Sequence, residues 1–234
     1  MERNRPGASK MVDTAETGEW SEELARCYCE GMEANVKYDH RPCARRIAAD
    51  LSTCRPGLTA PVVLDVAAGP AFLLLELAPH LPGARLLAND SAPVMLDLAV
   101  ERARARGLEV EPLLCPAEGL TLADQSVDVV ICKHYLRLSP DPLRLLEECH
   151  RVLGPDGVLY LVDFNGEASK LKARVLWTWI RVMNSKKLAQ EFWESFAGGY
   201  PVSSVPPRCV AAGFASATVL RRGLSYLVRA TRVG

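Results

Sequence analysis

The sequence predicts an α/β fold: a doubly wound, Rossmann-like, mostly parallel seven-stranded sheet with an antiparallel C-terminal hairpin strand and a helical cap. Three observations predict it. Short apolar runs rich in β-branched residues alternate with helical patterns between Pro61 and Phe164, as in a parallel sheet covered on both faces. Two more strands follow near the C-terminus, joined by a short turn. A long, aromatic helical stretch lies between these two parts and forms the predicted cap.

The predicted elements follow one another at short intervals. A flexible polar tail covers 1–18, and one domain covers 19–234, with two short helices in 19–55 and the cap insert in 165–200. The strands are expected at 61–66, 85–88, 109–114, 127–132, 158–164, 215–221 and 225–232. The other helices are expected at 72–81, 92–106, 141–153 and 206–213.

Length and composition exclude several classes of protein. The 234 residues fit one α/β domain, and 49% of them are hydrophobic, which allows a large core. No apolar run approaches the roughly 20 residues of a membrane span, and the N-terminus lacks the apolar stretch of a secretion signal. We therefore expect a cytoplasmic protein with reduced thiols. Apart from Cys27 and Cys29 the cysteines stand alone, so no metal site is expected.

Positive charge gathers in the C-terminal third. From Asn165 to Gly234 there are eleven Lys and Arg against three Asp and Glu, although the whole chain is formally neutral. This pattern fits a solvated basic face, or a cap that favours an anionic or electron-rich substrate. No long basic run is interleaved with aromatic residues, so a nucleic-acid partner is not expected. The expected partner is a small molecule, and a homodimer is left open.

The first predicted strand leads into a turn of small residues. Asp65 lies near the end of the strand, and the segment A-A-G-P-A leads into the next helix. Such a turn puts backbone N–H groups and a helix N-terminus at the carboxyl edge of the sheet, where ligands bind. Only Gly69 is a glycine, so the dinucleotide pattern G-x-G-x-x-G is absent. By themselves, these residues fit a ligand-binding loop and a plain tight turn equally well.

The end of the second predicted strand favours the ligand-binding interpretation. Asp90 stands 21 residues after Gly69, where a carboxylate can accept both hydroxyls of a ribose. Met95 follows shortly after. Its flexible thioether can pack on a flat adenine or fill the core, and both interpretations remain open.

The segment from Val62 to Phe164 resembles the class I S-adenosylmethionine-dependent methyltransferases, in particular the small-molecule group that includes the quinone-ring methyltransferases. The family's first motif is similar to V-V-L-D-V-A-A-G-P-A, and its second to A-N-D-S-A-P-V-M-L. The stretch that reaches adenine resembles C-P-A-E-G-L-T-L-A-D-Q-S-V-D-V-V. The turn into the fifth strand resembles H-R-V-L-G-P-D-G-V-L-Y-L-V-D-F. All four stretches occur in the family's order.

The resemblance implies transfer of the methyl group of S-adenosylmethionine to a small acceptor, with S-adenosylhomocysteine as the product. It also implies the cofactor contacts. Asp65, Ala67 and Gly69 are expected around the amino-acid part, and Asp90 at the ribose. Contacts on the adenine side are expected from Ser91, Met95, Ala117 and Glu118. Cys132 and Lys133 are expected near the sulfur, and Tyr38 is expected to close over the cofactor.

The sequence also departs from the family's pattern. Ala67 and Ala71 replace glycines, which reduces backbone freedom but adds little bulk. Pro116 replaces an acid that often binds the adenine amino group. These departures keep open a non-catalytic binding or partner subunit with the same fold. A dinucleotide oxidoreductase is a further alternative, but it lacks its glycine pattern.

The acceptor side is predicted from position and residue type. His134 and Tyr135 follow the fourth strand, where a general base would stand, although a packed or surface histidine fits as well. His40 is a weaker candidate base. Aromatic residues at helical spacing in the cap fit a core, or a clamp on a flat, partly apolar acceptor of quinone or natural-product type. The predicted substrate contacts are Trp177, Arg181 and Trp193.

Overall fold

The computed structural model describes residues 20–183 and 186–233, so the predicted tail lies outside the described residues. Within them seven strands form one sheet in the order β3-β2-β1-β4-β5-β7-β6. Strand β7 runs antiparallel to β5 and β6, and the other pairs are parallel. The strands are β1 (Val62–Val66), β2 (Arg85–Asp90), β3 (Glu111–Leu114), β4 (Val127–Lys133), β5 (Leu153–Phe164), β6 (Ser216–Arg222) and β7 (Ser225–Thr231).

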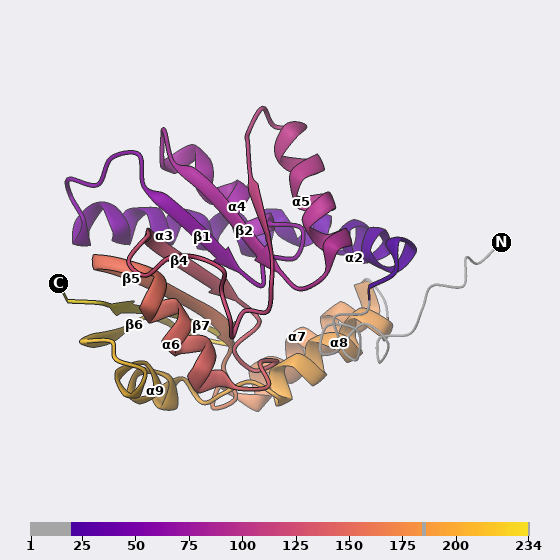
Figure 1. Ribbon diagram of the computed structural model, residues 1–234. Helices are drawn as coiled ribbons and strands as arrows, with labels where there is room; N and C mark the ends of the chain where they lie inside the picture. Colours follow the sequence, from indigo (N-terminus) through magenta and orange to yellow (C-terminus); the bar gives the residue numbers. More distant parts are fainter. Residues whose placement is uncertain (1–19, 184–185, 234) are drawn as a thin grey trace.

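Helices cover both faces of this sheet (Figure 1). One face is covered by α3, α4 and α5, and the other by α6 and α9. The helices are α2 (Glu22–Asn35), α3 (Arg41–Cys54), α4 (Phe72–Leu77), α5 (Pro93–Arg104), α6 (Pro142–Val152), α7 (Lys170–Met183), α8 (Lys186–Ala197) and α9 (Val205–Ala211), with the short turns η1 (Val36–His40), η2 (Ala78–His80) and η3 (Val202–Ser204). The predicted doubly wound fold is therefore confirmed.

Alternation along the central strands fills both halves of the core. In β1, Leu64 and Val66 pack on the side of α6 and α9, whereas Val63 packs on the side of α3 to α5. In β4, Val130 packs on the side of α6 and α9, and Ile131 packs on the side of α3 to α5. Because both faces are covered, these strands consist of nearly continuous apolar residues, which is why the sequence revealed them.

Some boundaries differ from the prediction. The helix expected at 72–81 ends at Leu77 and continues as the turn η2, because Pro79 cannot donate a helical hydrogen bond. Strand β5 starts at Leu153 rather than 158, since Leu153 pairs with Val127 ahead of a register shift. The cap, expected as one helical stretch, consists of the two helices α7 and α8.

Three further features bear on function. In the part of the chain that the structure describes, no helix is long and apolar enough to cross a bilayer. The eight cysteines are free thiols, six of them buried. The described His, Cys, Asp and Glu residues include no group of three that could hold a metal ion.

Candidate active site

The carboxyl ends of β1, β2 and β4 form one edge of the sheet. The strand order reverses beside β1, since β2 and β3 lie on one side of it and β4 and β5 on the other. Doubly wound sheets bind ligands at such a reversal. The predicted cofactor residues, apart from Tyr38, lie in these strand ends, in the segments that follow them or, for Ala117 and Glu118, in the loop after β3. The structure therefore brings the predicted cofactor residues to a single edge.

Every second residue from 67 to 71, in the loop after β1, has a left-handed backbone conformation. Ala67, Gly69 and Ala71 have φ angles of +51°, +52° and +56°. A left-handed conformation costs a residue with a side chain about 1–2 kcal/mol, so the two alanines hold strain that glycines would not. A Cβ built on Gly69 would meet nothing within 4 Å, which shows open space beside the loop. Strain and open space together are typical of a loop shaped for a ligand.

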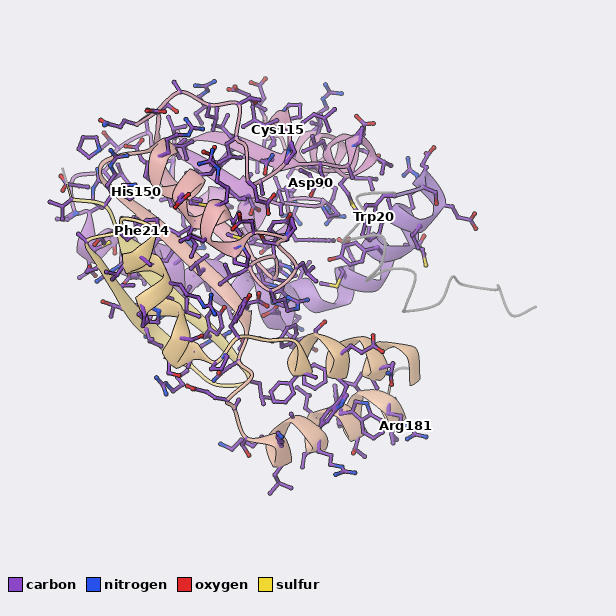
Figure 2. All side chains as sticks on the ribbon, turned by 60° about the horizontal axis from the view of Figure 1, so that its bottom comes forward. Trp20, Asp90, Cys115, His150, Arg181 and Phe214 are labelled. Carbon is purple, nitrogen blue, oxygen red and sulfur yellow. The ribbon has the colours of Figure 1, made fainter. Side chains whose placement is uncertain are left out.

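Two polar residues at the end of β2 hold this loop in place. The Asp90 carboxylate accepts hydrogen bonds from Gly69 N at 2.8 Å and from Ala92 N at 3.0 Å. Asn89 is fully buried and donates from Nδ2 to Cys115 O at 2.7 Å. Asp90 and Cys115 lie close together in Figure 2. Asn89 was not predicted as a site residue, although a lone amide in an otherwise apolar strand must find partners and was the available signal.

The two carboxyls of this edge are poorly hydrated. Asp65 is 3% exposed, and burial raises the pKa of its carboxyl to about 8, although a hydrogen bond from Leu74 and the charge of Lys133 oppose the rise. Burial also raises the pKa of Asp90, against the hydrogen bonds from Ala92 and Gly69. A cation bound nearby would favour the ionised form of both groups. The edge therefore suits a positively charged ligand.

The residues predicted beside adenine differ in exposure. Ser91 is exposed, as is Pro116, whereas Ala117 is buried. Met95 is 2% exposed and packs with Phe72 and other residues in a cluster between α2, α4 and α5. The thioether of Met95 thus belongs to a core cluster in this structure.

Glu118 joins the loop after β3 to the loop after β4. Its Oε1 atom accepts hydrogen bonds from Tyr135 Oη at 3.2 Å and from Ser139 Oγ at 2.5 Å. Burial and the neighbouring carboxylate raise the pKa of Tyr135, so its phenol stays protonated and donates. The predicted catalytic Tyr135 and the predicted adenine-side Glu118 are therefore in direct contact.

A charged group stands at the end of β4. Lys133 Nζ lies 2.7 Å from Asp39 Oδ2 and 3.1 Å from His134 Nε2. Burial and the charge of Lys133 lower the pKa of His134 well below its usual value, so its imidazole is neutral at pH 7. Burial opposes ionisation of Asp39, but Lys133 outweighs it and holds the pKa of that carboxyl below its usual range. The neighbouring Cys132 is buried, and burial raises the pKa of its thiol.

The turn η1 supplies Asp39 to this group from far away in the sequence. The sequence analysis predicted Tyr38 as the functional residue of this turn, and the structure places Tyr38 77% exposed. His40, the weaker candidate base, is buried with its ring 5.4 Å from that of Phe72. Asp39 was missed because its only signal was its place next to Tyr38, and the pairing with Lys133 is a tertiary contact.

A buried ion pair connects the edge to the cap. Arg137 Nη1 lies 2.6 Å from Asp163 Oδ1, with both side chains nearly inaccessible. Arg137 also donates to His134 O at 2.8 Å and to Ser195 Oγ on α8 at 3.3 Å. Arg137 thus links the end of β4, the end of β5 and the cap, and it was not predicted from the sequence.

The structure brings the three predicted substrate residues together in the α7–α8 hairpin. The rings of Trp177 and Trp193 meet edge to face, with centroids 6.5 Å apart. The guanidinium of Arg181 lies 5.1 Å from the centroid of Trp177. The three side chains thus form one cluster that joins the two helices.

These features define a doubly wound, Rossmann-like protein whose ligand edge lies where the strand order reverses. Residues 64–161 match the methyltransferase domain family. The chain is 39% identical over 102 residues to the demethylmenaquinone methyltransferase of Thermus thermophilus, covering 44% of this chain and 46% of that one. It is 32% identical over 120 residues to the ubiquinone biosynthesis O-methyltransferase of Haemophilus ducreyi, covering 49% of this chain and 50% of that one.

The chain thus spans about half the length of the curated relatives it matches. A crystal structure of an S-adenosylmethionine-dependent methyltransferase from Aquifex aeolicus has the same fold, with a TM-score of 0.62 at 22% identity over 86% of this chain and 98% of that one. Residues 64–161 are therefore similar to a methyltransferase domain, and the predicted resemblance to this family is confirmed.

Proposed function

We propose that this protein transfers the methyl group of S-adenosylmethionine to a small, flat or partly apolar acceptor of quinone or natural-product type. The observation that carries the proposal is the strained loop joined to a carboxylate at the reversal of strand order, where Gly69 N lies 2.8 Å from Asp90 Oδ2. The matching family and the names of the two relatives support the reaction and the acceptor class. The free thiols are in keeping with a cytoplasmic location.

The edge fits the cofactor in space and in charge. There is room beside Gly69, and the poorly hydrated carboxyls of Asp65 and Asp90 gain from a cation. When bound, the cofactor supplies a methyl group on a positively charged sulfur. We propose that Asp65, Ala67 and Gly69 surround its amino-acid part and that Asp90 accepts the ribose hydroxyls. The other proposed contacts are Ser91, Met95, Ala117, Glu118, Cys132, Lys133 and Tyr38.

The acceptor needs to be held in line with the methyl group and away from water. Trp177 and Trp193 offer flat apolar surface for this, and Arg181 offers positive charge. His134 is the proposed base: its imidazole is neutral, and its Nε2 lone pair, which accepts from Lys133 Nζ at 3.1 Å, takes the acceptor proton once this contact opens. Tyr135 stays protonated, so its proposed part is to orient Glu118. These roles predict that His134→Gln lowers kcat by about 100-fold, while Trp177→Ala raises KM.

Calorimetry tests the cofactor half of the proposal. The full chain is expected to bind S-adenosylmethionine, and Asp90→Ala to lose about 100-fold in affinity, which is about 2.7 kcal/mol. Asp97→Ala is the matched control, because Asp97 is exposed on α5 of the same domain and is expected to bind normally. An Asp90→Ala variant that is folded and binds as well as the wild type contradicts the assigned site.

An acceptor screen with labelled cofactor tests the reaction. Transfer of label to a hydroxylated quinone or a related flat molecule is the expected result. Cofactor binding without transfer to any acceptor in such a screen favours the alternative of a non-catalytic partner subunit. No present comparison supports that alternative, since the relatives are named as enzymes.

A further inference from the structure

Helix α7 exposes an apolar stripe on the side that does not pack on α8. The stripe consists of Leu171, Val175, Trp179 and Val182, which are 74%, 64%, 57% and 74% exposed. Their spacing of four, four and three residues puts them on one side of the helix. The opposite side carries Ala173, which is fully buried, and Trp177, whose ring meets that of Trp193 on α8. The stripe is therefore apolar surface that the hairpin itself does not need.

Positive charge flanks this α7 stripe. Helix α7 carries Lys170, Lys172, Arg174 and Arg181 and no acidic residue. At 3.6 residues per turn, Lys172 lies beside one border of the stripe, and Arg174 and Arg181 beside the other. Exposed hydrophobic side chains bordered on both sides by cations are the pattern of a helix that lies in the interface of an anionic membrane.

The position of the hairpin makes the stripe accessible. In Figure 2 the α7–α8 hairpin projects from the body of the protein, and Arg181 lies on its outer side. A second copy of the chain packed stripe against stripe would bring the cations of the two α7 helices together without an acidic partner in either helix. Anionic lipid headgroups instead complement the cations at both borders of the stripe.

We propose that the α7 stripe docks on the surface of an anionic lipid bilayer, with its four apolar side chains in the interface and with Lys172 and Arg174 on lipid phosphates. This docking goes beyond methyl transfer and does not depend on it. Cations near an anionic surface and apolar side chains in the interface both favour binding, so the two kinds of group act together.

Vesicle co-sedimentation of the full chain, without cofactor, tests the proposal. The protein is expected to sediment with vesicles of phosphatidylcholine and phosphatidylglycerol and to bind pure phosphatidylcholine at least about tenfold more weakly. Binding is expected to weaken as salt rises, because the Debye length falls from about 10 Å at 0.1 M to about 3 Å at 1 M. A wild-type protein that stays in solution with both kinds of vesicle overturns the proposal.

Paired variants separate the two contributions. Lys172→Glu with Arg174→Glu, and separately Leu171→Ser with Val182→Ser, are each expected to lower partitioning into anionic vesicles by about tenfold or more. All four side chains are exposed, so the fold is expected to persist, and circular dichroism and thermal unfolding check it.

Matched controls remove the same kinds of group elsewhere. Arg45→Glu with Arg104→Glu changes two exposed cations on α3 and α5, and Leu114→Ser with Val210→Ser removes exposed apolar groups on β3 and α9. Both controls are expected to bind within about twofold of the wild type. Equal losses in the controls and the α7 variants overturn the proposal. A second outcome also overturns the proposal. In this outcome the wild type does not bind vesicles, and sedimentation velocity shows a dimer that Leu171→Ser with Val182→Ser dissociates.

Discussion

The carboxyl edge of the sheet and the α7–α8 hairpin are built in opposite ways. At the edge, polar groups from different strands hold one another: Asp90 holds the loop after β1, and Asn89 holds the end of β3. The hairpin instead packs its own aromatic rings together and reaches the edge through the hydrogen bond from Arg137 to Ser195. The edge is fixed by long-range polar contacts, whereas the hairpin is held mainly by apolar contacts between its two helices.

This difference separates the two halves of the proposed reaction. Cofactor chemistry is the same for every acceptor, and we assign it to the part of the molecule that strand pairing makes rigid. Acceptor recognition varies between enzymes of one fold, and in the proposed reaction it is assigned to a peripheral hairpin. Three predictions test how far this division holds.

The largest expected effect concerns the stability of the edge. The pKa of Asp65 is about 8 in the folded protein, against 3.8 for an ordinary aspartate. Because the folded state keeps the proton, the contribution of Asp65 to stability is complete below about pH 4 and falls until about pH 8. The loss is at most about 6 kcal/mol. Asp65→Asn should abolish this dependence, as urea unfolding at several pH values will show.

The wild type should therefore lose stability relative to Asp65→Asn as the pH rises through this range. Asp97→Asn, on the exposed side of α5, is the control that should follow the wild type. Parallel pH profiles for wild type and Asp65→Asn would show that the edge tolerates an ionised carboxylate.

The second effect concerns the link between edge and hairpin. Arg137→Met leaves Asp163 buried without its cation and should lower the free energy of unfolding by about 3–5 kcal/mol. Arg137→Met with Asp163→Leu should recover most of this loss, because the stranded charge is gone. Limited proteolysis should also cut the α7–α8 hairpin faster in Arg137→Met.

An exposed pair provides the comparison for this link. Arg26→Met breaks the contact with Glu22, whose side chain is 71% exposed, and should cost less than about 1 kcal/mol. If Arg137→Met lowers the free energy of unfolding no more than Arg26→Met does, the buried pair does not anchor the hairpin.

The smallest effect concerns strain in the loop after β1. Ala67→Gly and Ala71→Gly should each stabilise the fold by about 1 kcal/mol, since glycine adopts a positive φ without strain. Ala49→Gly, at an exposed position inside α3, should destabilise by a similar amount. Thermal unfolding measures the change in Tm. A rise for Ala67→Gly and Ala71→Gly with a fall for Ala49→Gly supports strain in the loop, and a fall for all three variants contradicts it.

Part of the site was predictable because strand ends fix it. Asp65, Gly69 and Asp90 lie at the ends of buried parallel strands, which the apolar pattern locates, so their meeting at one edge follows from the sequence. Asp39 and Arg137 were not predictable, because each acts through a partner on a distant element. Met95 shows a third case, in which one residue type fits both a ligand contact and a core, and burial places it in a core cluster.

The sequence by itself determined the order of the strands along the chain, the small-residue turn and the spacing from Gly69 to Asp90, because buried strands and tight turns demand particular residues. The tertiary structure decided which faces are covered. Helix α7 is apolar on two sides, and Trp177 and Trp179 are only two residues apart, so periodicity cannot tell which ring packs inward. Packing against α8 puts Trp177 in the hairpin cluster and leaves Trp179 exposed, which creates the α7 stripe.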